Sequence, residues 1–172
     1  DVGCGGGILC ESLALRGAEV TGIDMGEAPL SVARLHQLES NLTINYKKIT
    51  AEELAAQEPG TYDIVTCLEM LEHVPDPSKV IQAFADLVKP NGDVYFSTIN
   101  RNPKSYVFAI IGAEYVLQLL PKGTHDYNKF IKPSELASWA RKAGLDWLEI
   151  SGMTYNPFTK KYKLHKSDVD VN

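Results

Sequence analysis

Short strand-type segments and helix-type segments alternate along most of this chain. Apolar, β-branched runs of strand length occupy residues 18–24, 44–49, 62–67, 93–99 and 145–150. Helical spacing of apolar residues occupies residues 8–16, 29–38, 51–56, 77–88 and 133–143. Strands that alternate with helices in this order form a mostly parallel sheet with helices on both faces. The pattern therefore predicts a doubly wound α/β fold in a single domain, residues 1–172.

The composition fits a packed domain and argues against several classes of protein. At 172 residues and 44% apolar content, the chain can fill one hydrophobic core. Its net charge of −5 repels phosphate, so we expect no nucleic-acid partner. No run reaches the roughly 18 apolar residues that a membrane span needs. Cys4, Cys10 and Cys67 have no metal-ligand spacing and no disulfide framework, which indicates a reducing compartment.

Both ends of the sequence have the pattern of an interrupted strand. Asp1 and Val2 stand directly before a glycine cluster, although such a loop normally follows a whole buried strand. Residues 169–172 alternate like the start of another strand. We therefore expect a partial sequence whose first strand is truncated.

Residues 102–132 interrupt the alternation. An insertion of about thirty residues is usually a lid or a disordered loop, and its apolar content argues against disorder. Within it, residues 105–120 carry one charged side chain, Glu114. As a helix this segment spans roughly 24 Å, at about 1.5 Å per residue, which is short of the roughly 30 Å hydrocarbon core. The pattern leaves three interpretations open: a buried accessory helix, a lid, or a helix in the membrane interface.

The glycine-rich loop Asp1–Gly7 (DVGCGGG) is the first candidate site. Glycines at positions 3, 5 and 7 permit positive φ and let a ligand approach the backbone closely. The nicotinamide-binding fingerprint needs a further glycine where this chain has Ile8. A nicotinamide dehydrogenase is therefore disfavoured.

The D-x-G-x-G-x-G pattern of this loop resembles motif I of the class I S-adenosylmethionine-dependent methyltransferases. The resemblance implies a seven-stranded Rossmann-like sheet that binds S-adenosylmethionine, with Gly3, Gly5 and Gly7 around its amino-acid arm. Asp1 then meets the positive charge of the cofactor. Asp24, about twenty residues beyond the glycines, ends the next strand-type run, where a carboxylate accepts hydrogen bonds from ribose hydroxyls. The other candidate cofactor contacts are Met25, Ala51, Glu52 and Leu68.

An acidic segment, residues 67–77 (CLEMLEHVPDP), follows the strand-type run at 62–67. Glu69, Glu72 and His73 are spaced i, i+3 and i+4, so a helical turn would place them on one face. Two carboxylates and an imidazole can hold a divalent cation such as Mg²⁺ or Zn²⁺. Alternatively, His73 acts as the general base that deprotonates a substrate hydroxyl. Because similar segments occur in methyltransferases without a metal, the sequence leaves both interpretations open.

Later segments make the resemblance more specific. Residues 112–115 (GAEY), 121–126 (PKGTHD), 129–130 (KF) and 155–158 (YNPF) are similar to segments of the ubiquinone biosynthesis O-methyltransferases. Members of that family methylate polyprenyl catechol and demethylubiquinol intermediates. The resemblance implies S-adenosylmethionine-dependent O-methylation of a phenolic hydroxyl, with His73, Glu69 and His125 as the candidate catalytic residues.

The resemblance also implies where such a protein works and what it contacts. A polyprenyl tail partitions into lipid, so we expect residues 102–132 to form a helical lid that contacts lipid through residues 105–120. The expected location is cytoplasmic and peripheral on a bacterial inner membrane, or on the matrix side of a mitochondrial inner membrane, beside other ubiquinone biosynthesis proteins. A class I methyltransferase for another small molecule and a lipid-binding module without activity are the alternatives.

Overall fold

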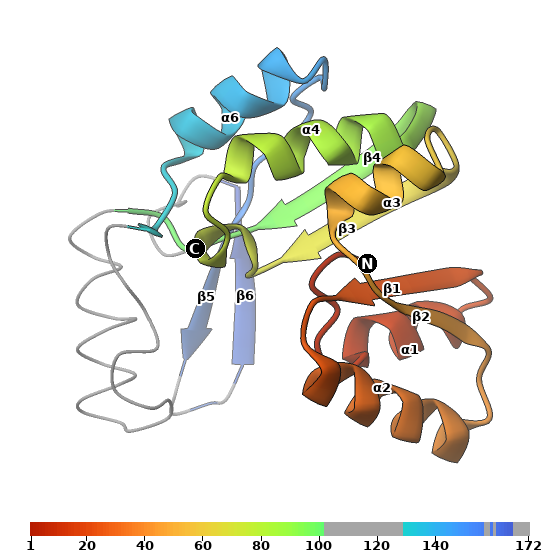
Figure 1. Cartoon of the computed structure of the whole chain (residues 1–172). Coiled ribbons are helices and arrows are strands. Elements are labelled where there is room, and N and C mark those ends of the chain that lie inside the picture. Colours follow the sequence, from red (N-terminus) through yellow and green to blue (C-terminus); the bar gives the residue numbers. More distant parts are fainter. Residues whose placement is uncertain (102–128, 157–158, 160, 167–172) are drawn as a thin grey trace. The chain divides into compact units, whose positions relative to one another are not determined.

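The computed structural model describes residues 1–101, 129–156, 159 and 161–166 (Figure 1). The chain divides into two compact units. One consists of Asp1–Met70 with Asp76–Phe96, and the other of Leu71–Pro75 with Ser97–Asn172.

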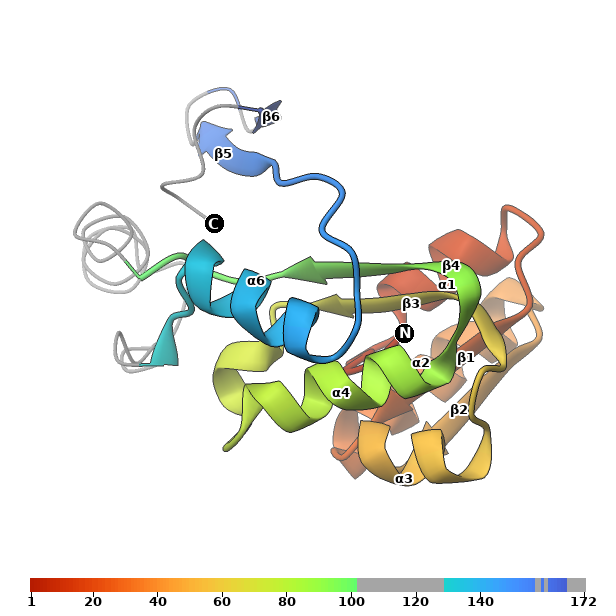
Figure 2. The same cartoon turned by 90° about the horizontal axis from the view of Figure 1, so that it is seen from above.

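The first unit contains the alternating elements that the sequence predicts. Its helices are α1 (Ile8–Ala14), α2 (Glu27–Ser40), α3 (Ala51–Gln57) and α4 (Pro77–Leu87). Its strands are β1 (Val20–Asp24), β2 (Ile44–Lys48), β3 (Tyr62–Leu68) and β4 (Val88–Ser97), the last residue of which belongs to the second unit. In Figure 1, α3 and α4 lie on one side of the strands and α1 and α2 on the other. Figure 2 shows α4 running alongside β3. The predicted helices on both faces are therefore present in this unit.

Asp1 and Val2 connect the two strand pairs of the first unit. β1 and β2 are parallel, and β3 pairs with β4, whose arrowhead lies at the same end in Figure 1. Val2 forms a parallel bridge with Ile23 of β1, and its N–H donates to the Thr66 carbonyl of β3 at 2.8 Å. The spatial order is therefore β2, β1, Asp1–Val2, β3, β4. The part of the chain that the structure describes has six strands, so the seven-stranded sheet stays a prediction.

Apolar side chains on both sides of these strands form the core of the first unit. A cluster beside α1 and α2 consists of Cys4, Cys10, Val20, Leu30 and Ile44. The amphipathic helix α4 buries Val80, Ile81, Ala83, Phe84 and Leu87. The rings of Phe84 and Phe96 have centroids 5.6 Å apart. Burial of each large apolar side chain contributes about 1.5–3 kcal/mol, so these clusters fix the helices against the strands.

Polar side chains set the starts of α3 and α4. Thr50 and Glu53 form a capping box at the first turn of α3. Asp76 caps α4 by accepting the Ser78 N–H at 3.1 Å, and Pro77 takes the first helical position. The capping box fixes the segment that carries the candidate residues at positions 51 and 52.

The second unit contains a 3₁₀ turn, a helix and a hairpin. They are η1 (Leu71–His73), α6 (Pro133–Lys142), and the antiparallel strands β5 (Gly152–Asn156) and β6 (Lys161–His165). The Ile131 N–H donates to the Ile99 carbonyl at 3.1 Å, and Arg101 pairs with Glu135 of α6. These contacts bring together the chain segments before and after residues 102–128.

Two predicted elements differ from the structure. Residues 145–150 are not a strand, and β5 begins only at Gly152. Leu148 is 81% exposed, so the apolar side chains of that segment are not buried as a strand of this sheet requires. β4 begins at Val88 rather than at residue 93 and includes Asn91, which has a φ of 65°.

The insertion and the C-terminal residues lie largely outside the described residues. The predictions for residues 102–128, including the lid, the lipid contact at 105–120 and His125, therefore lie outside the described residues, as does the strand predicted at 169–172. Among the helices that the structure describes, none combines the length and apolar character needed to cross a bilayer.

Candidate functional site

The glycine loop lies against the carboxyl end of β1. Gly3, Gly5 and Gly7 have φ values of 72°, 52° and 84°, in the left-handed region that favours glycine. The N–H of Gly5 donates to Oδ2 of Asp24, the last residue of β1, at 3.0 Å. The loop and the carboxylate that the sequence assigned to one site are therefore adjacent.

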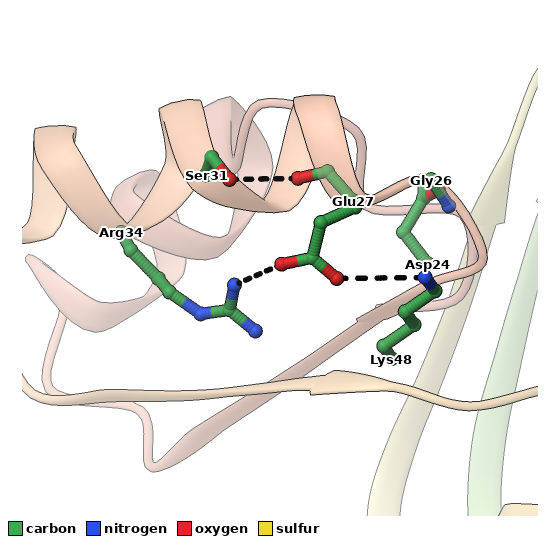
Figure 3. A network of polar contacts seen from close by, with 6 residues as sticks. All are labelled: Asp24, Gly26, Glu27, Ser31, Arg34 and Lys48. Carbon is green, nitrogen blue, oxygen red and sulfur yellow. Dashed lines mark hydrogen bonds and ion pairs between the residues drawn. The ribbon is translucent and has the colours of Figure 1, made fainter.

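Backbone N–H groups hold both oxygens of the Asp24 carboxylate. Oδ1 accepts the N–H of Gly26 at 2.7 Å, in an Asx-type turn that leads into α2. Figure 3 shows Asp24 beside Gly26 at this turn. Each carboxylate oxygen can accept more than one hydrogen bond, so this partly buried group still has capacity for a pair of ligand hydroxyls.

Near Asp24, the carboxylate of Glu27 forms ion pairs with two basic side chains, Lys48 and Arg34. Lys48 stands opposite Asp24 in the β1–β2 register. Its Nζ lies 3.5 Å from Oε2 of Glu27, and Nη1 of Arg34 lies 3.1 Å from Oε1 of the same carboxylate (Figure 3). Exposed pairs of this kind contribute at most about 1 kcal/mol each. In the site, Lys48 pairs with Glu27 rather than with Asp24. The Asp24 carboxylate stays hydrogen-bonded to the N–H groups of Gly5 and Gly26.

Tyr46 of β2 packs beneath the glycine loop. A Cβ at Gly7 would collide with the Tyr46 hydroxyl, and one at Gly22 would lie 2.8 Å from Tyr46 Cε1. Only glycine therefore fits at these two positions. The Tyr46 hydroxyl is buried and has no hydrogen-bond partner in the described part of the chain, and burial raises its pKa. Tyr46 is thus neutral and supports the loop by packing.

The carboxylate of Asp1 is bonded within the protein. Its Oδ1 accepts the hydroxyl of Thr66 at 2.8 Å, and its Oδ2 accepts the thiol of Cys10 at 3.4 Å. A hydrogen bond with Cys4 and then burial raise the pKa of Cys10, so this thiol stays protonated at neutral pH. Asp1 therefore links the loop to β3 and α1, and its contact with the cofactor stays a prediction.

The remaining predicted cofactor contacts lie at the ends of strands of the first unit or just after them. Met25 follows β1 and is 59% exposed, and Leu68 ends β3 and is 42% exposed. Ala51 is buried and Glu52 exposed in the first turn of α3, just after β2. Exposed apolar side chains at the end of a strand suit a flat aromatic base, and the contact of these four residues with a cofactor stays a prediction.

The acidic segment after β3 does not form the predicted helical turn. Glu69 is exposed and has a φ of 52°, and η1 begins only at residue 71. Glu72 is 4% exposed and its Oε2 accepts the Thr98 hydroxyl at 3.1 Å, whereas His73 is exposed. The helical turn that would place all three side chains on one face is therefore not formed, because Glu69 is left-handed and lies before η1. Within the described ranges no group of three or more His, Cys, Asp or Glu side chains gathers to hold a metal.

Comparisons with known proteins decide the family. A family model described as a methyltransferase domain matches residues 1–150. A protein of Saccharophagus degradans named ubiquinone biosynthesis O-methyltransferase is 70% identical over all of this chain, which covers 73% of that protein. Proteins of the same name from Stutzerimonas stutzeri and Pseudomonas aeruginosa are 72% and 68% identical over the whole chain, and it covers 74% of each. The chain belongs to the ubiquinone biosynthesis O-methyltransferase family. It is accordingly a methyltransferase, as the sequence resemblance implied.

Solved structures support the fold of this family member. A methyltransferase of Thermotoga maritima, titled a possible histamine N-methyltransferase, has a TM-score of 0.71 and 19% identity, covering 97% of this chain and 73% of that one. A methyltransferase of Methanosarcina mazei has a TM-score of 0.71 and 20% identity, covering 95% and 86%. Both are titled S-adenosylmethionine-dependent. At such identities the likeness shows the fold alone, an α/β fold shared with these methyltransferases.

The sequence interpretation missed Gly26, Thr66 and Met70, which all shape the loop and its carboxylates. Gly26 has a local signal, since Asp-x-Gly after a strand is typical of an Asx turn. Thr66 and Met70 contact the loop only because Asp1 and Val2 pair with β3, and no local pattern predicts that pairing.

Proposed function

We propose that this protein transfers the methyl group of S-adenosylmethionine to a phenolic hydroxyl of a polyprenylated catechol or demethylubiquinol during ubiquinone biosynthesis. The observation that carries the cofactor assignment is the 3.0 Å contact between the Gly5 N–H and the Asp24 carboxylate. The family membership and the printed names of the relatives support the reaction.

The first unit supplies the groups proposed for the cofactor. Gly3, Gly5 and Gly7 leave space along the loop for the amino-acid arm. Asp24 accepts the two ribose hydroxyls with the oxygens that already accept the N–H groups of Gly5 and Gly26. The exposed side chains of Met25 and Leu68, with Ala51 and Glu52, border the base. Asp1 contributes negative charge near the positively charged sulfur.

The proposed chemistry needs a phenol that has lost its proton. S-adenosylmethionine supplies a methyl group on a cationic sulfur, which is already a good electrophile. A phenol has a pKa of about 10 and is a poor nucleophile at neutral pH. A general base that accepts its proton during the transfer removes this limitation. His73 is our first candidate because its imidazole is exposed in η1, with Glu69 and His125 as further candidates.

A divalent cation, Mg²⁺ or Zn²⁺, would lower the pKa of the phenol and orient its oxygen. The described residues do not fit a preformed three-ligand site. Glu72 is buried against the Thr98 hydroxyl, and the backbone at Glu69 breaks the helical spacing that would have aligned it with His73. The proposed reaction therefore includes no step that depends on a metal.

We further propose that residues 102–132 form a lid over the substrate and that residues 105–120 contact lipid. The apolar composition of this segment supports the proposal, because a polyprenyl tail is most soluble in the bilayer. The proposed location is peripheral, on the cytoplasmic face of the inner membrane in bacteria or the matrix face in mitochondria. Other ubiquinone biosynthesis proteins are the proposed partners there.

The experiment that tests this function is a methyl-transfer assay with labelled S-adenosylmethionine and prenylated catechols of short and long chain. We expect label on a ring oxygen, higher kcat/KM for the long-chain substrate, and no change with a chelator. Cofactor binding without methylation of any catechol would favour a methyltransferase for another small molecule. Vesicle binding without cofactor binding would favour a lipid-binding module.

A further inference from the structure

The backbone at Glu69 has a conformation that glutamate rarely adopts. In the part of the chain that the structure describes, three non-glycine residues have positive φ: Asn41, Glu69 and Asn91. Asparagine is common in this region, and Asn41 ends α2 while Asn91 lies within β4. Glutamate has no such preference, so contacts on either side must hold this residue in place.

The turn at Glu69 directs the next side chain, Met70, onto the glycine loop. A Cβ built on Gly3 would lie 2.7 Å from Met70 Cγ and 3.0 Å from Met70 Cβ. These atoms are close to the Met70 backbone, so rotation at the end of the side chain cannot clear them. Met70 therefore covers Gly3 closely, while the Glu69 side chain is exposed.

Hydrogen bonds fasten the loop on the same side. The Val2 N–H donates to the Thr66 carbonyl at 2.8 Å, and the Thr66 hydroxyl donates to Asp1 Oδ1 at 2.8 Å. Residues 1–3 thus lie against residues 66–70 of β3 and its turn. On the other side, the Gly5 N–H is held by Asp24 of β1. The loop is therefore fixed between the ends of two strands.

We propose that Met70 is a positioning residue for the glycine loop and sets the affinity for S-adenosylmethionine without contacting the reacting atoms. This inference rests on the proposed function, because the ligand is the same cofactor. The loop needs such support because its three glycines with positive φ leave the backbone many alternative conformations. An unbranched methionine fills the irregular space above Gly3.

The first test compares Met70→Ala with Met70→Leu in the full chain, by calorimetric titration with S-adenosylmethionine and by kcat with a prenylated catechol. We expect Met70→Ala to weaken cofactor binding about tenfold, with kcat at saturating cofactor changed less than about threefold. Met70→Leu keeps a Cγ atom and stays within about threefold of wild type in binding. Unchanged binding in Met70→Ala, or equal losses in both variants, would overturn the proposal.

A double-mutant cycle with Gly3→Ala makes the test specific to the contact. The new Cβ meets Met70, and it also strains a backbone with a φ of 72°. The strain is the same in both backgrounds and cancels in the cycle, whereas the collision with Met70 Cγ is absent when residue 70 is alanine. We expect Gly3→Ala to weaken binding at least about threefold less in the Met70→Ala background.

The outcomes of the cycle separate the two proposals. If Gly3→Ala abolishes binding in both backgrounds, the same double-mutant cycle can be measured by thermal unfolding. We then expect Gly3→Ala to lower Tm less in the Met70→Ala background than in the wild type. Additive effects in binding and in Tm would overturn the role of Met70 alone. A wild-type protein that does not bind S-adenosylmethionine would instead overturn the proposed function, and the role of Met70 with it.

Discussion

The glycine loop and the turn after β3 both contain residues with positive φ, but the residue types differ. Both follow strand segments of the first unit, and both use positive φ. In the loop, this conformation belongs to Gly3, Gly5 and Gly7, whereas after β3 it belongs to Glu69. Glycine adopts it freely, and glutamate only under constraint. The loop is thus intrinsically adaptable and needs partners to fix it, while the turn is strained and serves to present side chains.

This difference between the adaptable loop and the strained turn suggests separate roles for the two regions. The loop and Asp24 are bonded to each other and are expected to determine cofactor binding. The acidic segment directs Met70 onto the loop, buries Glu72 and leaves Glu69 and His73 exposed. Substitutions in the loop region should therefore change the Kd for the cofactor, and His73 substitutions should change kcat.

The largest expected effect is at His73. Replacing His73 with Asn removes the proposed general base and should lower kcat about 10²-fold or more, with the Kd for S-adenosylmethionine unchanged. Steady-state kinetics at saturating cofactor, together with calorimetry, measure the two quantities. If the His73 variant changed the Kd and left kcat intact, the loop and the acidic segment would not have separate roles.

At Asp24, the expected effect is on binding. Asp24→Ala removes the acceptor for the Gly5 and Gly26 N–H groups and for the ribose, so the Kd should rise about 100-fold. Glu27→Gln is the matched control, because this neighbouring carboxylate only holds exposed Arg34 and Lys48 (Figure 3). Equal losses in the two variants would show a general effect of charge near the start of α2.

Glu72 should affect stability more than chemistry. Glu72→Ala leaves the buried Thr98 hydroxyl without this acceptor, and the free energy of unfolding should fall by about 1–3 kcal/mol. His73→Ala, at an exposed neighbouring position, should change it by less than about 0.5 kcal/mol. Urea unfolding of both variants distinguishes the two positions. An unchanged free energy of unfolding in Glu72→Ala would contradict this structural role.

The smallest expected effect is at Tyr46, where the substitution should not lower the free energy of unfolding. Tyr46→Phe removes a buried hydroxyl that has no hydrogen-bond partner among the described residues and keeps the ring beneath Gly7. We expect the free energy of unfolding to stay equal or to rise by up to about 1 kcal/mol, and cofactor binding to stay within about twofold. A clear loss of stability would mean that the hydroxyl is bonded in solution.

What the sequence could predict depended on how local the signals were. The glycine loop, Asp24 and most helix and strand positions follow from short patterns, such as glycines that permit positive φ and the spacing of apolar residues. The acidic segment also matched a local pattern, helical spacing, yet only residues 71–73 form a 3₁₀ turn and Glu69 lies before it. Contacts between residues far apart in the chain, Met70 with Gly3 and Glu72 with Thr98, determine its conformation instead.

Residues 145–150 show the same limit on a larger scale. Their apolar residues predicted a strand, but a strand forms only where a neighbour offers its backbone groups. In the structure, that pairing occurs later, between Gly152–Asn156 and Lys161–His165. Local sequence preference indicates a strand, but the strand forms only where another segment is available to pair with its backbone.

Amide hydrogen exchange with and without S-adenosylmethionine tests the central claim most directly, because it reports on individual segments of the site. The account predicts slower exchange in the presence of the cofactor at residues 3–7, 24–26 and 68–70. The amides of β5 and β6 are predicted to exchange at the same rate with and without cofactor. Protection absent from the glycine loop and from the turn at 24–26, despite saturating cofactor, would contradict the account.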